Sequence, residues 1–430
     1  MLKIIDYQKN PQEVYQLLAG RAPYDAEALV SAEQIFSAIQ AEGDEALQGY
    51  CQRFGWKSPI EAIVSQDEIE TAYRQVDADF LAAIRLSIEN VRRFHARQMP
   101  QGGLVPEADG TILGSLYLPV DRAGIYAPGG TAAYPSSVVM GAVPAILAGV
   151  KEVVLATPPG PDGRVNPATL VAAAESGVHE IWKLGGVRGI AVMAMGTETF
   201  APVMKIAGPG NKYVTAAKRI VYGKVDIDML AGPSEILVIA DATADPIYIA
   251  ADLLSQAEHD EMAGSILVTD CPDIALQVAG EVERQMAKLS RREIAAQSIA
   301  TFGAAIIVKD IDEACQLADE FAPEHLEIIT EDPIAWVSKI RHAGSIFLGP
   351  WTPEPVGDYL AGSNHILPTG RTARYFSGLG LTFFLRRMSV IGWSKERLLS
   401  QGHHIVTLAT VEGLDGHAAA VKKRLERMMD

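Results

Sequence analysis

The feature that most constrains this chain is a regular alternation of short apolar runs and amphipathic segments between residues 136 and 348. Strands that alternate with helices form parallel sheets joined by right-handed crossovers. The spacing predicts helices at 136–149, 167–176, 187–195, 211–222 and 245–258, with more starting at 272 and 312. It predicts strands at 152–157, 180–184, 204–206, 236–240, 265–269, 304–308, 326–329 and 344–348. That is enough for two such sheets.

The regions outside this alternation are predicted to be mostly helical. Residues 1–100 carry apolar residues at helical spacing, strands are expected near 112–126, and helices are expected at 381–388, 394–402 and 410–428. A chain of 430 residues is too long for one small core. The predicted fold is α/β, with two parallel-sheet units of incomplete Rossmann-like topology and helical segments at both ends. The predicted domains are a helical segment 1–23, a discontinuous α/β domain 24–122 with 238–376, an inserted nucleotide-binding domain 123–237, and a helical segment 377–430.

Charge and cysteine content exclude several classes of protein. The formal net charge is −16, which disfavours non-specific binding to nucleic acid or anionic membranes. Cys51, Cys271 and Cys315 are far apart and odd in number, so neither a disulfide framework nor a thiolate zinc cluster is expected. No stretch reaches the ~20 apolar residues of a membrane span, and the first residues lack a signal-peptide core. These features predict a cytoplasmic protein.

Three glycine-rich turns follow predicted strands and precede predicted helices. They are Tyr126-Ala-Pro-Gly-Gly130, Leu184-Gly-Gly-Val-Arg188 and Ala207-Gly-Pro-Gly-Asn-Lys212. Helix N-termini present free N–H groups to phosphates, so together the turns resemble an incomplete dinucleotide site. Taken singly, each turn is better explained as a tight turn. Tyr126 is a candidate for stacking on a flat ring, and Asn211 for a hydrogen bond to a ribose or amide.

Two stretches carry candidate imidazole chemistry. Gln256 and His259 are three residues apart near a predicted helix end, which suits half of a metal site or simply a solvated helix face. Glu324 and His325 are adjacent in a bend between a helix and a strand. They suit a paired acid and base, or an exposed loop pair. His95 lies in a long amphipathic helix and is expected to be solvated.

Residues 349–370 form a long stretch with little predicted structure, which is typical of a functional loop. Asp358 is a candidate oxygen ligand, and His365 is either a ligand or a residue that orders the loop. Near the C-terminus, Glu412 and His417 are further candidates. Gln256, His259, Asp358 and His417 would supply nitrogen and oxygen ligands suited to zinc, with manganese as a substitute. Spacing alone does not assemble this set.

Motifs along most of the chain resemble those of the histidinol dehydrogenase family, in the family's order. The motifs are Tyr126-Ala-Pro-Gly-Gly-Thr-Ala-Ala-Tyr-Pro-Ser-Ser137, Ala207-Gly-Pro-Gly-Asn211, Asp228-Met-Leu-Ala-Gly-Pro-Ser-Glu235, Leu253-Leu-Ser-Gln-Ala-Glu-His259, Ala322-Pro-Glu-His-Leu-Glu327, and Gly357-Asp-Tyr359 with Asn364-His365. The resemblance implies two successive NAD-linked oxidations of L-histidinol, through a bound aldehyde to L-histidine, in the last steps of histidine biosynthesis. It also implies a homodimer with shared active sites and one Zn²⁺ per subunit.

The resemblance also implies residue roles. Glu324 and His325 match the catalytic pair, and Tyr126 and Asn211 match nucleotide contacts. The metal ligands would be Gln256, His259, Asp358 and His417, the last from the other subunit. Those ligands would also contact substrate, together with Ser234, His325 and Glu412. The implied chemistry has His325 taking the hydroxyl proton and Glu324 assisting water addition to the aldehyde. Glu412 would pair with the substrate ammonium group.

Two positions depart from the family pattern. Arg188 stands where the family usually has a nucleotide-contacting Gln, and its guanidinium offers donors but no acceptor. Gly141 stands where the family often has Asn. Both lie in the predicted cofactor unit, and they leave room for a related NAD-dependent dehydrogenase of another polar alcohol, such as a sulfonated diol. A zinc hydrolase without nucleotide and a non-catalytic binding protein are the remaining alternatives.

Overall fold

The computed structural model describes residues 2–19, 26–129 and 133–429. The chain forms two compact units, Met1–Gln98 with Val120–Phe384 and Met99–Pro119 with Leu385–Asp430. The first unit contains two parallel sheets and the second an antiparallel sheet. The predicted α/β class is therefore confirmed. None of the described helices is long and apolar enough to span a membrane.

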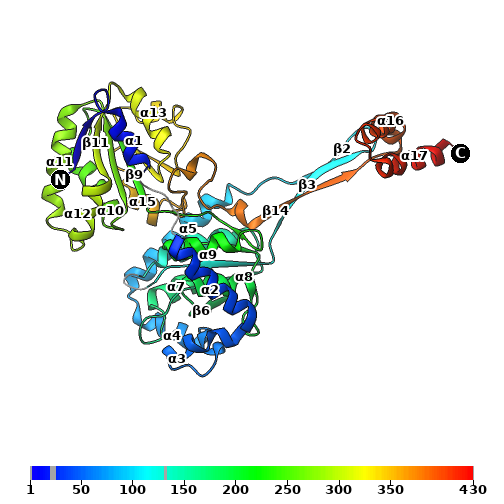
Figure 1. The fold of residues 1–430 in the computed structure, drawn as a ribbon, viewed down its shortest axis with the longest axis horizontal. Coiled ribbons are helices and arrows are strands. Elements are labelled where there is room, and N and C mark those ends of the chain that lie inside the picture. Colours follow the sequence, from blue (N-terminus) through cyan, green and yellow to red (C-terminus); the bar gives the residue numbers. More distant parts are fainter. Residues whose placement is uncertain (1, 20–25, 130–132, 430) are drawn as a thin grey trace. The chain divides into compact units, whose positions relative to one another are not determined.

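The six-stranded sheet of the first unit is parallel throughout, in the order β1-β11-β10-β9-β12-β13. Its strands are β1 (Lys3–Asp6), β9 (Glu235–Ala240), β10 (Gly264–Thr269), β11 (Gly303–Ile307), β12 (His325–Ile329) and β13 (Ser345–Leu348). Helices α10 (Pro246–Ala257), α11 (Pro272–Met286) and α12 (Arg292–Phe302) cover one face; α1 (Pro11–Ala19) and α13 (Ile311–Phe321) cover the other (Figure 1). Both faces of β9 are buried, which explains its uninterrupted apolar run.

The predicted helical start of the chain is wrong at Lys3–Asp6, which is strand β1. This strand pairs in parallel with β11, and Ile5 packs into the core beside that strand. Local periodicity cannot reveal such a pairing, because the partner lies about three hundred residues further along the chain.

The five-stranded sheet of the first unit is also parallel, in the order β6-β5-β4-β7-β8. Its strands are β4 (Arg122–Tyr126), β5 (Glu152–Ala156), β6 (Glu180–Trp182), β7 (Lys205–Ala207) and β8 (Asp226–Ile227). Its helices are α6 (Pro135–Leu147), α7 (Pro167–Ser176), α8 (Gly186–Met195) and α9 (Lys212–Val221). The chain runs outward from β4 to β6 and then returns to β7 on the other side of β4. The topological switch point, where such sheets bind ligands, therefore lies between the ends of β4 and β7.

The N-terminal helices pack largely on the helices of this five-stranded lobe. They are α2 (Ala26–Glu42), α3 (Gln48–Arg53), α4 (Gln66–Gln75) and α5 (Ala78–Ala96), with 3₁₀ turns η1 (Gly43–Leu47) and η2 (Pro59–Ala62). Apolar residues of α2 such as Phe36 and Ile39 share a core with Trp182. The prediction grouped these helices with residues 238–376 instead. How the chain divides into independently folding domains stays a prediction.

The second unit holds the antiparallel sheet β14-β3-β2 and two helices. Its elements are β2 (Gly103–Pro106), β3 (Ile112–Pro119), β14 (Leu385–Gly392), α16 (Lys395–Val411) and α17 (Asp415–Met429). The predicted helix at 381–388 is wrong: a short 3₁₀ turn, η4 (Leu381–Phe384), leads into β14. Pairing with β3, distant in sequence, overrides the local pattern here.

The stretch 349–370 is more structured than expected. It contains the short helix α15 (Glu354–Tyr359), which begins after Pro353 and is followed by the 3₁₀ turn η3 (Thr372–Arg374). Among the described residues, the one short helix not yet named is α14 (Ile334–Val337). Proline at the first helical positions is compatible with a helix, so the proline-rich sequence hid α15 from the periodicity argument.

Candidate active site

Glu324 and His325 lie at the amino end of strand β12, at 6% and 4% exposure. Helix α13 ends at Ala322, whose left-handed backbone (φ 46°) turns the chain toward the strand. A Glu324 carboxylate oxygen accepts a hydrogen bond from the Glu235 N–H at 3.0 Å, and His325 Nδ1 lies 3.0 Å from the Glu235 carbonyl. The alternative of an exposed loop pair is wrong. Because Nδ1 donates to a carbonyl, the neutral imidazole carries its lone pair on Nε2.

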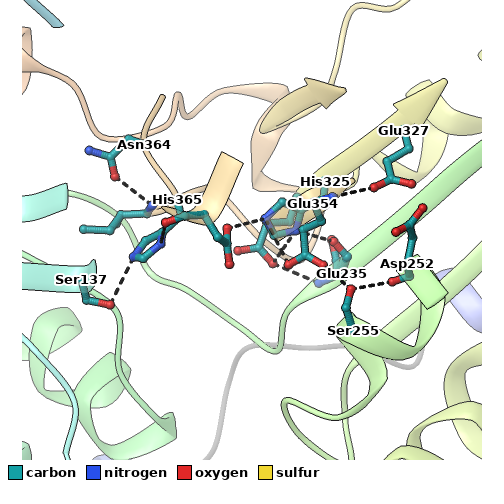
Figure 2. A network of polar contacts seen from close by, with 12 residues as sticks. Ser137, Glu235, Asp252, Ser255, His325, Glu327, Glu354, Asn364 and His365 are labelled. Carbon is teal, nitrogen blue, oxygen red and sulfur yellow. Dashed lines mark hydrogen bonds and ion pairs between the residues drawn. The ribbon is translucent and has the colours of Figure 1, made fainter. Parts of the chain in front are cut away.

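His325 Nε2 faces two carboxylates (Figure 2). Glu354 Oε1 lies 3.9 Å away and Asp358 Oδ1 3.8 Å away. One ligand atom from each of the three side chains falls within 4.8 Å of the others. Nε2 is buried and has no hydrogen-bond partner among the described residues. An unpartnered buried nitrogen that faces carboxylates is available to a substrate proton or a cation.

Behind His325 lies a network of buried acidic groups (Figure 2). Ser255 donates to Glu354 Oε2 at 2.9 Å, and the Glu354 N–H donates to Glu327 at 2.8 Å. Burial raises the pKa of both Asp252 and Glu327, and the charge of Asp252 raises that of Glu327 further. Glu354 was not singled out from the sequence, and its position between two prolines offered no signal for it.

Burial raises the pKa of several of these groups. It raises the pKa of Glu324 to about 8 and that of Asp252 to about 7, and it raises the pKa of Glu354. Burial alone would lower the pKa of His325, but the facing carboxylates Glu324, Glu354 and Asp358 outweigh it and raise that pKa to about 9. A dense group of buried oxygen ligands beside an imidazole is the donor set that a divalent cation requires.

Gln256 supplies a second indication of a cation. Its side chain is fully buried near the end of α10, and neither its amide oxygen nor its amide nitrogen has a hydrogen-bond partner among the described residues. The alternative of a solvated helix face is therefore wrong for Gln256, while His259, just past the helix, is exposed. A buried carboxamide without partners costs about 1–3 kcal/mol, and a ligand that binds its oxygen would offset this cost.

The comparisons with known proteins agree with these observations. The sequence profile of the family described as histidinol dehydrogenase matches residues 21–425. The histidinol dehydrogenases of Heliobacterium mobile and Moorella thermoacetica are 52% and 49% identical, each over 99% of this chain and 100% of the relative. A crystal structure of histidinol dehydrogenase from Elizabethkingia anophelis superposes with a TM-score of 0.93 at 38% identity, covering 97% of both chains. This chain belongs to the histidinol dehydrogenase family. The resemblance predicted from motifs is confirmed.

Members of this family are named for histidinol. The remaining residues predicted to form the site lie in both compact units. Ser234 immediately precedes β9, and its carbonyl accepts the N–H of Gly264. Asp358 is half-buried in α15. Glu412 and His417 belong to the second compact unit, where both side chains are exposed, Glu412 at the end of α16 and His417 in α17.

Two of the predicted cofactor residues, Tyr126 and Asn211, lie at the switch point of the five-stranded sheet, whereas Arg188 follows the edge strand β6. Tyr126 ends β4; its ring is buried, and its hydroxyl accepts the Gly186 N–H at 2.9 Å. Asn211 caps α9, with its carboxamide oxygen accepting the N–H groups of Tyr213 and Val214. Arg188 lies in the first turn of α8. Residues 130–132 of the turn after β4 lie outside the described residues.

The two departures from the family pattern have different settings. The Arg188 guanidinium lies over the Tyr50 ring, 5.5 Å from its centroid. Gly141 is buried in α6, and a Cβ there would lie 2.5 Å from a methyl of Ile125. A larger residue at 141 would therefore require Ile125 to move, so only a residue as small as glycine fits beside Ile125 in its present position.

His365 orders its loop through both ring nitrogens. Nε2 lies 3.2 Å from the Ser137 hydroxyl, and Nδ1 lies 3.1 Å from the Asp358 carbonyl. The adjacent Asn364 donates to the Met140 carbonyl at 2.7 Å. Of the two predicted alternatives for His365, the structure supports loop ordering, because both nitrogens have protein partners.

Proposed function

We propose that this protein is a metal-dependent, NAD-linked enzyme that oxidises L-histidinol through L-histidinal to L-histidine. The observation that carries the proposal is the buried Glu324–His325 pair, whose unpartnered Nε2 faces Glu354 and Asp358. Family membership supports the same reaction. A cytoplasmic location is part of the proposal.

The residues proposed to hold the metal are Gln256, His259 and Asp358, with His417 from a second copy of the chain. The unpartnered carboxamide of Gln256 and the cluster of His325, Glu354 and Asp358 each offer donors that suit a cation with nitrogen and oxygen ligands. Zinc is proposed, with manganese as a substitute. The bound metal would orient the substrate's imidazole and amine, and NAD would accept the hydride.

His325 is proposed to take the proton from the substrate hydroxyl at Nε2 in its neutral form, which a cation held among the facing carboxylates would favour by offsetting the negative charge that raises the His325 pKa to about 9. Its Nδ1–H contact with the Glu235 carbonyl holds the ring in the tautomer that this step needs. The carboxylates of Glu354 and Asp358 stabilise the imidazolium that results, because they lie within 4 Å of Nε2.

Glu324 is proposed to assist water addition to the aldehyde before the second oxidation. Burial raises its pKa to about 8, so its carboxyl group exchanges protons near neutral pH. Glu412 is proposed to pair with the substrate ammonium group, and Ser234 to contact substrate. Tyr126, Arg188 and Asn211 are proposed to contact NAD.

A homodimer with shared active sites is proposed from the second unit. Its sheet exposes apolar side chains on all three strands: Leu104, Val105, Ile112, Leu113, Leu116, Leu118, Met388 and Ile391. Its helices expose Leu399, Leu408, Val411 and Leu414. A small sheet with so much exposed apolar surface requires a covering partner, and a second copy provides one.

The first experiment is to incubate zinc-loaded protein with NAD and L-histidinol and to count NADH formed per histidinol consumed. Two NADH per substrate, with histidine as product, are expected. Turnover of a sulfonated diol but not of histidinol would assign the sibling activity. Absence of NADH with either alcohol would overturn the proposed function and favour the hydrolase alternative.

A further inference from the structure

A buried ion pair in the five-stranded lobe has no role in the chemistry described above. Lys218 of α9 and Asp228, just after β8, have side chains only 3% and 1% exposed, and Lys218 Nζ lies 2.6 Å from Asp228 Oδ1. Burying two charges costs several kcal/mol per ion, and their mutual attraction offsets this only with good geometry and further hydrogen bonds. The further hydrogen bonds therefore indicate what the pair is for.

Both charged groups hold the same glycine. The Gly208 N–H donates to Asp228 Oδ2 at 2.7 Å, and its carbonyl accepts a hydrogen bond from Lys218 Nζ at 2.5 Å. Asp228 Oδ1 also accepts the Met229 N–H at 2.7 Å. The pair therefore binds both polar groups of Gly208, and it fixes the orientation of the two peptide planes that flank this residue.

Gly208 needs that support because its backbone is unusual. Its φ of +128° is a conformation that residues with a side chain rarely adopt, and a Cβ would lie 2.0 Å from the Tyr126 carbonyl oxygen. The backbone of Gly208 therefore lies directly against that of Tyr126. The next turn residues are equally constrained, since a Cβ on Gly210 would lie 2.4 Å from Val214.

This turn carries Asn211, and its neighbour across the switch point is Tyr126. Both are proposed cofactor contacts. The Asn211 carboxamide is held by the two N–H groups at the start of α9, the same helix that supplies Lys218. Displacement of Gly208 would therefore shift Asn211 and Tyr126 relative to each other.

We propose that Lys218 and Asp228 are positioning residues, which hold the Gly208–Asn211 turn in the conformation that binds the nicotinamide dinucleotide. The inference rests on the proposed NAD-linked function. The pair touches neither Glu324 nor His325 in any described contact, so its effect is on cofactor affinity and not on proton transfer.

The lobe contains a matched control. Lys205 of β7 and Asp226 of β8 form a second ion pair at 2.8 Å, with side chains 13% and 45% exposed. This pair links two strands of the same sheet and makes no described contact with the 208–211 turn. Its removal tests the effect of losing a lysine–aspartate pair from this lobe without disturbing the turn.

The experiment compares Lys218→Met and Asp228→Asn with Lys205→Met and Asp226→Asn in the zinc-loaded, full-length protein. Isothermal titration measures the dissociation constants of NAD and of histidinol separately, and steady-state kinetics measure KM for NAD and kcat. For each variant of the buried pair we expect NAD affinity and KM to worsen about tenfold or more, as when a preorganised site must reorder on binding. Histidinol affinity and kcat at saturating NAD should change less than about twofold, since the pair touches no reacting group.

Each outcome decides the proposal. Unchanged NAD affinity in a folded Lys218→Met protein would overturn the proposal. Equal weakening of NAD and histidinol binding in that variant would also overturn it. So would a loss of NAD affinity in the Lys205→Met control as large as that in Lys218→Met. If Lys218→Met does not fold, Asp228→Asn decides instead, because asparagine keeps the shape and an oxygen acceptor for Gly208. Failure of wild-type protein to bind NAD would instead refute the proposed function.

Discussion

The candidate sites of the two α/β lobes of the first unit treat their buried polar groups in opposite ways. In the six-stranded lobe, buried polar atoms of Gln256 and His325 lack hydrogen-bond partners among the described residues, and burial raises the pKa of the acids around them. In the five-stranded lobe, Lys218 and Asp228 satisfy each other and hold a glycine turn. Unpartnered groups are costly, and a protein retains them where a ligand completes their bonding. Paired groups such as Lys218 and Asp228 fix the conformation of the backbone that is proposed to bind the cofactor.

The lobes also differ in which edge of the sheet they use. The cofactor candidates Tyr126 and Gly208–Asn211 follow the carboxyl ends of β4 and β7, as expected for a switch point. Glu324 and His325 lie instead at the amino end of β12, beside Glu235 at the amino end of β9. His325 lies 3.8 Å from Asp358 there, and Ser255 near the end of α10 binds Glu354 of α15.

The largest expected effect tests the chemical lobe. His325→Ala should lower kcat by about 10²–10⁴-fold, the usual contribution of a positioned acid or base, because it removes the nitrogen that faces Glu354 and Asp358. Stopped-flow measurement of NADH checks this. NAD affinity should stay near that of the wild type, and a large loss of NAD affinity would contradict the separation of roles between the lobes.

Metal removal should separate function from stability in that lobe. Chelation should abolish turnover, and added zinc should restore it while raising the free energy of unfolding by about 2.7 kcal/mol at a hundredfold excess over its dissociation constant. Gln256→Leu should lose most of this zinc-dependent stabilisation.

Without metal, the free energy of unfolding of Gln256→Leu should exceed that of wild type by about 1–3 kcal/mol, because the substitution removes an unpartnered buried amide. The variant should therefore unfold at a higher urea concentration. Urea titrations with and without zinc measure both effects. If the metal-free variant proves less stable than wild type, Gln256 has a structural partner and the comparison between the lobes fails.

Gly208→Ala tests the satisfied lobe. The added methyl would meet the Tyr126 carbonyl in a backbone with φ +128°, so we expect a loss of roughly 3 kcal/mol from strain and overpacking together. Gly223→Ala is the control, because Gly223 has φ +99° and nothing within 4 Å of an added Cβ. That control should lose only about 1–2 kcal/mol from backbone strain. Equal losses in urea unfolding would show that the close approach to Tyr126 does not matter.

His95, which packs beside the five-stranded lobe, is the subject of the smallest expected effect. It is fully buried in α5, with Nδ1 2.9 Å from Gln98 and Nε2 unpartnered among the described residues, so the prediction of a solvated residue is wrong. Burial lowers its pKa below 6.5. The unfolded chain therefore binds a proton at a pH where the folded chain does not. The contribution of neutral His95 to the free energy of unfolding is fully present above pH 6.5 and is lost as the pH falls below 6.5.

The measurement is urea unfolding of wild type and His95→Gln from pH 7.5 to 5.0. Wild type should lose up to about 1.4 kcal/mol more per pH unit below pH 6.5 than the variant. His404→Gln, which changes an exposed histidine, should keep the wild-type slope. Parallel slopes for wild type and His95→Gln would mean that this histidine takes up its proton in the folded state as readily as in the unfolded chain.

Local sequence patterns determined most of the elements in the first unit. Apolar runs such as Glu235–Ala240 form strands because both faces of a parallel sheet are buried, and this leaves a signal in the sequence. The glycine turns after β4 and β7 were also visible, because a close approach or a positive φ requires glycine. The adjacency of Glu324 and His325 suggested chemistry, and the motifs identified the family.

Only the tertiary structure decided the rest, because it depends on residues far apart in the chain. Strand β1 needs β11, and β14 needs β3, so local periodicity missed both. Glu354 reaches His325 only through the fold of α15. The burial of Gln256 and His95, and the joining of Lys218 to Asp228 over Gly208, depend on packing that no sequence spacing encodes. A polar residue becomes functional through what surrounds it, and those surroundings come from the folded chain.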